Sequence, residues 1–146
     1  MDPAVQPVAA ARGVRIIHAA LVMGQILVGA TFFFLLRAQG QPIAGGGPLI
    51  GYVTAGLALV NLTVAFGLLR SRIPQRRMDQ SPDDYWNNTE ARGPAVVIWA
   101  VLEGSGLFCW IGYVMTGGIV PAAVGALAIV ALIMVRPSQL EGDGAP

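Results

Sequence analysis

The sequence is poor in the residues from which most catalytic and metal sites are built. It has one cysteine, Cys109, one histidine, His18, and no lysine, so all nine of its basic residues are arginine. A single cysteine cannot form an internal disulfide, a CxxC redox pair or a thiolate metal site. One histidine offers no second imidazole ligand for a haem or a metal ion. We therefore expect no catalytic residue set, no metal site and no cofactor, and we do not expect an enzyme.

Charge is also scarce, at 12% of residues, and nine basic residues against eight acidic ones give a formal net charge of +1. This balance provides no general attraction to nucleic acid, and we exclude a nucleic-acid partner. What the sequence has in abundance is apolar residues, at 55%, and its mean hydropathy is +0.64. That composition is typical of a membrane protein, so the first partner we expect is the lipid bilayer.

Four apolar runs predict four membrane-spanning helices, because about 20 helical residues cross a hydrocarbon core of ~30 Å. They would leave almost no polar face for water, which argues against a soluble helical protein. We predict an all-α, integral membrane four-helix bundle in residues 14–136, with a loop at 70–94 and tails at 1–13 and 137–146. The predicted spans are Ile16–Leu36, Leu49–Leu69, Ala95–Thr116 and Ile119–Val135.

The arginines predict the orientation of these spans, because positively charged loops stay on the cytoplasmic side. Only Arg37 falls in an outer segment, whereas the other eight arginines lie before the first span, in the 70–94 loop or after the last span. We therefore expect both termini and the 70–94 loop to be cytoplasmic, in a multi-pass protein of the plasma membrane (the inner membrane of a bacterium).

The 70–94 loop has a basic part, "RSRIPQRR", which anionic headgroups would attract, followed by "SPDD". Ser81 in that second motif is a suitable N-cap for a short helix that begins at Pro82. Trp86 in this helix, and Arg15 and His18 at the start of the first span, are expected at the membrane interface.

Aromatic residues near the span ends, Trp99, Trp110 and Tyr113, are also expected to anchor in the interface. Gly117 and Gly118 leave only a two-residue turn between the third and fourth runs. Such a short turn predicts that these two spans are antiparallel neighbours.

The first and third runs resemble each other at a shift of 80 residues, where "AALVMGQIL" (19–27) aligns with "WAVLEGSGL" (99–107). Gly24 then falls on Gly104, and Gln25 on Ser105. The match predicts a parallel 2+2 repeat of helical hairpins, against the alternative of coincidence between two Ala/Leu/Gly-rich spans.

Three polar residues in three different spans share one depth, ~13–15 Å from the cytoplasmic ends at 1.5 Å per residue. They are Glu103, Gln25 and Asn61, and Ser105 lies beside Glu103 in sequence. A carboxylate at mid-membrane is costly, by at least ~2.5–3.5 kcal/mol if ionised. The four residues are therefore either a proton or ion site, or a structural polar cluster that fixes helix register.

A short motif around this carboxylate resembles a known family. The residues "EGSGLFCWI", Glu103 to Ile111, are similar to the ion-binding helix of rotary ATPase proteolipids, in which a mid-membrane carboxylate is followed three residues later by glycine, then leucine and an aromatic residue. The resemblance implies an ion-binding role for Glu103. The chain as a whole resembles uncharacterised small four-span bacterial membrane proteins, a resemblance that implies no particular activity.

Two functions remain open from the sequence. The first is a non-enzymatic subunit, scaffold or assembly partner of a larger membrane complex, either with other membrane subunits or as a homo-oligomer. The alternative is a transporter or channel that moves a proton or a monovalent cation by way of Glu103.

Overall fold

The computed structural model describes residues 10–43 and 47–142, and it is helical without a β-strand in these ranges. The all-α fold class expected from the sequence is confirmed. Parts of both predicted tails and of the first outer turn fall outside the described residues. The helices, in chain order, are α1 (Ala10–Gln39), α2 (Pro48–Val64), the π-helical η1 (Ala65–Leu69), the 3-10 helical η2 (Arg70–Arg72), α3 (Pro82–Asn87), α4 (Thr89–Thr116), α5 (Ile119–Met134) and α6 (Pro137–Glu141).

Three of the described helices are long and apolar enough to cross a membrane: α1, the continuous helix Pro48–Arg72 that joins α2 to η1 and η2, and α4. These helices indicate a membrane protein. The apolar helix α5 is shorter, with 16 residues, which corresponds to ~24 Å of helix.

Helix α4 begins earlier than the apolar pattern predicts, at Thr89 instead of Ala95. The Asn88 side chain accepts a hydrogen bond from the backbone N–H of Glu90 at 2.9 Å, so a polar cap begins the helix before the apolar run. Likewise, Ser81 caps α3 by accepting a bond from the N–H of Asp84 at 3.1 Å, which confirms the predicted helix start at "SPDD".

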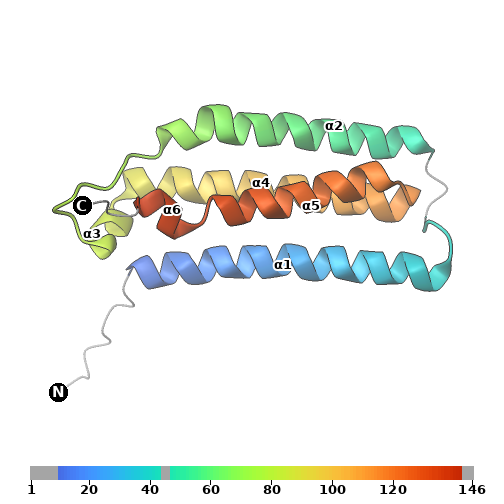
Figure 1. Ribbon diagram of the computed structural model, residues 1–146, viewed down its shortest axis with the longest axis horizontal. Coiled ribbons are helices and arrows are strands. Elements are labelled where there is room, and N and C mark those ends of the chain that lie inside the picture. The colour runs from blue at the N-terminus through green and yellow to red at the C-terminus, as the bar shows by residue number, and fades with distance from the viewer. Residues whose placement is uncertain (1–9, 44–46, 143–146) are drawn as a thin grey trace, which may run out of the picture.

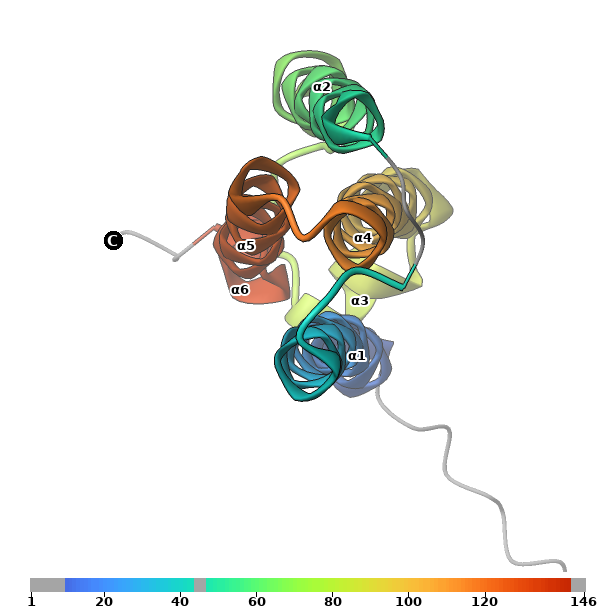
Figure 2. The ribbon, with the colours of Figure 1, turned by 90° about the vertical axis from the view of Figure 1, so that its right-hand side faces the viewer.

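The four apolar helices run side by side, with α4 and α5 in the middle and with α1 and α2 on opposite sides of that pair (Figures 1 and 2). α1 and α4 run in one direction, and α2 and α5 run in the other (Figure 1). α3, α6, the start of α1 and the end of α2 therefore gather at the same end of the molecule.

The predicted tight turn joins α4 to α5 as antiparallel neighbours (Figure 2). Gly117 ends α4 with φ at +65°, in the left-handed region that favours glycine. Its N–H bonds the carbonyl of Tyr113 at 2.7 Å and so satisfies a C-terminal carbonyl of α4.

Trp110 of α4 is buried inside the protein, where it packs between glycines of two other helices. A Cβ added to Gly29 of α1 would lie 2.7 Å from its ring, and one added to Gly125 of α5 would lie 3.0 Å from it. The expected interfacial anchoring of Trp110 is therefore wrong, and Tyr113 and Trp99 are buried as well. The two glycines on the neighbouring helices leave space for the ring of Trp110 in the interior.

Candidate functional site

Gln25 is the polar residue that joins α1 to α4. Its side chain is fully buried, and Nε2 donates hydrogen bonds to the backbone carbonyls of Leu102 at 3.1 Å and Glu103 at 2.8 Å. Gly106 makes this approach possible, because a Cβ at Gly106 would overlap the amide of Gln25. Hydrogen bonds across helices in lipid contribute ~0.6–2 kcal/mol, so Gln25 fixes the register of the two helices.

Two buried polar atoms in this part of the protein lack a hydrogen-bond partner among the described residues. They are Oε1 of Gln25 and Nε1 of Trp110. On α1, Gln25 lies one helical turn before Gly29, the glycine that Trp110 packs against. On α4, Trp110 lies one helical turn after Gly106, the glycine that Gln25 packs against. The α1–α4 contact therefore holds one free acceptor and one free donor at adjacent levels.

Glu103 lies at the margin of the α1–α4 contact. The residue four positions before it, Trp99, packs against α1, and the residue three positions after it, Gly106, receives Gln25. Ala100 and Gly104, on the other side of Glu103, are exposed, and Glu103 itself is partly exposed. Within the described ranges no residue forms a hydrogen bond with its carboxyl group, and Gln25 binds only its backbone.

The structure does not form the predicted polar cluster, in which Glu103, Gln25 and Asn61 were joined by equal depth and Ser105 by its nearness to Glu103 in sequence. Asn61 is exposed on α2, and α2 lies across the α4–α5 pair from α1 (Figure 2). Ser105 donates to the carbonyl of Val101 in its own helix at 2.6 Å. The depth of a residue along a helix does not determine the direction in which its side chain points around the helix axis. Asn61 and Ser105 point in other directions than the α1–α4 contact, so neither meets Gln25.

His18 is buried, contrary to the expected interfacial position. Its Nε2 lies 2.9 Å from the carbonyl oxygen of Leu132 in α5, and because a carbonyl only accepts, Nε2 carries the hydrogen. Its ring packs edge-on against Trp99 at 5.1 Å between centroids. Nε1 of Trp99 in turn donates to the carbonyl of Val135 at 2.7 Å. The two rings thus add hydrogen bonds to carbonyls at the C-terminal end of α5, where the carbonyl of Leu132 also accepts from the N–H of Val135 at 3.2 Å.

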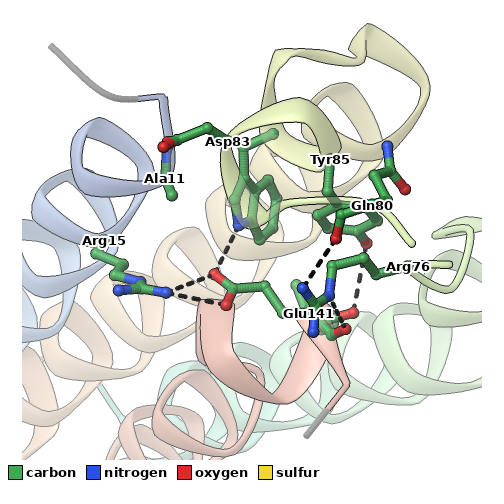
Figure 3. A network of polar contacts seen from close by, with 9 residues as sticks. Ala11, Arg15, Arg76, Gln80, Asp83, Tyr85 and Glu141 are labelled. Atoms are coloured by element: carbon green, nitrogen blue, oxygen red, sulfur yellow. Dashed lines mark hydrogen bonds and ion pairs between the residues drawn. The ribbon is translucent and has the colours of Figure 1, made fainter. Parts of the chain in front are cut away.

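Glu141 of α6 is the centre of a second polar network, which sequence reasoning missed (Figure 3). Its buried carboxylate accepts two bonds from Nη2 of Arg15, at 2.9 and 3.1 Å, and one from Nε1 of Trp86, at 2.7 Å. Nε of Arg76 donates to its backbone carbonyl at 3.2 Å. Arg15 and Glu141 are 126 residues apart, and nothing in the local sequence around either residue predicts this pairing.

Trp86 is fully buried, so its predicted position among lipid headgroups is wrong. It packs against Trp99 at 6.1 Å and against Tyr85 at 4.8 Å between ring centroids. With His18 beyond Trp99, these rings form a continuous row of edge-on and tilted aromatic contacts from α1 to α3. These ring contacts and the hydrogen bond to Glu141 account for the burial of Trp86.

Tyr85 and Asp83 hold α3 in place. The hydroxyl of Tyr85 donates to the carbonyl of Pro74 at 2.8 Å, and Oδ1 of Asp83 accepts from the N–H of Ala11 at 3.0 Å, which caps the start of α1. Burial raises the pKa of Tyr85, and the negative charge of Glu141 raises it further.

The described residues contain no group of three or more His, Cys, Asp and Glu side chains that could hold a metal ion. No protein-family model, curated protein or solved structure matches the chain. The arrangement itself is thus the basis for inferring function: a register-fixing amide, a partly exposed carboxyl group beside it, and a polar network that joins α1, α3 and α6.

Proposed function

We propose that this chain is a non-enzymatic integral membrane protein that acts as a subunit or assembly partner in a larger membrane complex. In this proposal α1, α2, α4 and α5 cross the plasma membrane as a four-helix bundle. Three of them are long and apolar enough to do so, and α5 packs against α4 with its apolar residues. The two hairpins have the parallel directions that a 2+2 repeat requires (Figure 1).

The distribution of arginine supports a cytoplasmic position for the end that carries α3 and α6. Arg15, Arg76 and Arg136 belong to this end, as do the other basic residues except Arg37, which lies in the last turn of α1 at the opposite end. Positively charged segments are retained on the cytoplasmic side. Both termini would then be cytoplasmic.

The partly exposed carboxyl group of Glu103 is the observation that carries the assembly proposal. In a lone chain this group would face acyl tails without a hydrogen-bond partner, at a cost of at least ~2.5–3.5 kcal/mol if ionised. The nearby side-chain donor, Nε2 of Gln25, already binds the backbone carbonyls of Leu102 and Glu103. A helix of a second copy or of another membrane subunit, with a hydroxyl, amide or guanidinium group at this level, would supply the missing donor.

Purification from native membranes in a mild detergent tests this proposal. We expect the chain to be recovered in a particle larger than the 15.2 kDa monomer, with a partner that cross-links to the segment around Glu103. Recovery as a lone monomer from membranes in which the chain is functional would contradict the proposal.

A second function, transport of a proton or monovalent cation, is favoured by one feature: the Glu103 carboxyl group makes no hydrogen bond to the described residues and is partly exposed. A carboxyl group in that condition is free to bind and release a proton. In proteoliposomes, proton flux that disappears in Glu103→Gln but persists in Asn61→Leu would support transport. Flux unaffected by Glu103→Gln would eliminate it, and carbodiimide would label Glu103 only if its protonated form is reachable.

A further inference from the structure

An apolar groove of about 410 Å³ lies between α2 and α5. Most of its lining side chains are exposed, including Leu59 at 44%, Leu127 at 48%, Val130 at 51% and Met134 at 58%. The polar lining residue Thr63 donates its hydroxyl hydrogen to the carbonyl of Leu59 at 2.8 Å, so it offers no free donor to a ligand. The groove therefore suits a ligand with an apolar chain.

The groove ends beside positive charge. The guanidinium carbon of Arg70 lies 6.0 Å from the ring centroid of Phe66, which lines the groove. Arg136 follows the lining residue Met134 by two positions. α2 and α5 contain no acidic residue, and the carboxylate of Glu141 is already paired with Arg15. Two exposed arginines, Arg70 beside Phe66 and Arg136 just after the end of α5, thus lie at this end of the groove.

The backbone is irregular at the same place. From Ala65 the helix continues as a π-helical turn, and the N–H of Arg70 bonds the carbonyl of Ala65, five positions earlier. π-Turns inside helices are rare and occur frequently at functional sites. This turn lies between the apolar lining of α2 and the guanidinium group of Arg70.

We propose that this groove binds an anionic phospholipid, with an acyl chain along α2 and α5 and the phosphate at Arg70 and Arg136. From Leu59 to Phe66 the groove extends over ~10 Å of helix, which is about two-thirds of the ~15 Å depth of one leaflet. Guanidinium groups bind phosphate through paired, charge-assisted hydrogen bonds. A partner helix would need its own acidic groups to neutralise both arginines, whereas an anionic lipid provides charge and chain together.

This inference depends on the proposed placement of the chain in a membrane. Native mass spectrometry from detergent tests it, with dioleoyl phosphatidylglycerol and dioleoyl phosphatidylcholine as probes that differ only in the headgroup. We expect tighter binding of the phosphatidylglycerol. Each of Arg70→Gln and Arg136→Gln should reduce that preference about fivefold. The matched control, Arg37→Gln at the opposite end, should leave it unchanged.

A second variant tests the groove separately from the charge. Thr63→Phe places a large apolar side chain in the groove and should displace the bound lipid while both arginines remain. An excess of glycerol 1-phosphate, which has the headgroup chemistry without an acyl chain, should not displace it. Equal binding of the two lipids, an unchanged preference in both arginine variants, or displacement by glycerol 1-phosphate would overturn the proposal. The proposal would also be overturned if the chain forms a dimer that Thr63→Phe dissociates without loss of bound lipid. The groove would then be the contact surface for a second copy of the chain.

These outcomes are distinguishable from failure of the proposed function. A chain that needs no detergent for extraction would contradict the membrane placement itself. A monomeric particle with a strong preference for phosphatidylglycerol would contradict assembly and leave the lipid site supported.

Discussion

The side-chain amide of Gln25 in α1 lies against Gly106 in α4, at a place where any Cβ would overlap it. The absence of a side chain at one position thus allows a buried amide at another to reach two backbone carbonyls. The contact between Gln25 and Gly106 sets the distance and register between α1 and α4. It therefore also fixes the position of Glu103, whose backbone carbonyl Gln25 binds.

Gly106→Ala should therefore destabilise the protein. The new methyl group must displace the Gln25 amide, and overpacking of this kind costs ~1–3 kcal/mol. Gly104→Ala is the matched control, because a Cβ there meets no atom within 4 Å. Both changes share the same gain in helix propensity, so the difference between their thermal stabilities in detergent isolates the clash. Equal stability of the two variants would show that the amide is not confined by α4.

A similar comparison tests the packing of Trp110 against α1. Gly29→Ala places a methyl group 2.7 Å from its ring, and we expect a loss of ~1–3 kcal/mol in the free energy of unfolding. Gly24→Ala, on the same helix with open space around it, should change stability little. Tryptophan fluorescence should shift only in the Gly29 variant, and a shift in both or in neither would contradict this packing.

Loss of the carboxylate at Glu141 should loosen the end of the molecule that carries α3 and α6. Glu141→Gln keeps an acceptor for Trp86 but removes the charge that binds Arg15, and hydrogen bonds to charged groups contribute about 1.5–3 kcal/mol. Because the Arg15 side chain is 54% exposed, we expect the lower part of that range. Amide hydrogen exchange should increase in α6, whereas Asp79→Asn in the exposed loop should leave it unchanged. Unaltered exchange in α6 would show that the ion pair does not hold it.

Ionisation of Tyr85 should lower stability in alkaline solution. Its pKa is raised above the ordinary value of 10.0 by burial, and further by Glu141. The folded state then holds the phenolic proton more tightly than the unfolded state, so its contribution is complete below pH 10 and is lost as pH rises through the folded pKa. Thermal stability should decline over this range, and the decline should be smaller in Tyr85→Phe. The exposed Tyr52 provides the control variant Tyr52→Phe, and an equal effect of both changes would contradict this assignment.

The helical elements could be predicted from the sequence because they depend on local patterns. The long apolar helices follow from their hydrophobic runs, the Ser81 cap follows from "SPDD", and the tight turn follows from two adjacent glycines. The arrangement of side chains around each helix axis depends on tertiary packing. For that reason the prediction from depth alone that Asn61 lies beside Glu103 was wrong. The prediction that Trp86 and His18 lie at the membrane interface was wrong for the same reason.

The polar network around Glu141 was beyond prediction for a related reason. Arg15 and Glu141 meet only because α1 begins at the end of the molecule where α5 ends, and α6 then brings the carboxylate to Arg15 and Trp86. Each residue alone has the sequence context of an exposed charge near a helix end. Their pairing depends on helix lengths and packing angles, which no short motif encodes.

Glu103→Leu tests the assembly proposal most directly, through the mass of the detergent-purified particle measured by light scattering. In an assembly whose partner supplies a hydrogen-bond donor to Glu103, leucine leaves that donor unsatisfied. We predict that wild type and the control Asn61→Leu form a particle larger than 15.2 kDa, and that Glu103→Leu shifts it toward the monomer. The assembly proposal would be contradicted if wild type and both variants are monomers and Glu103→Leu is more stable than wild type.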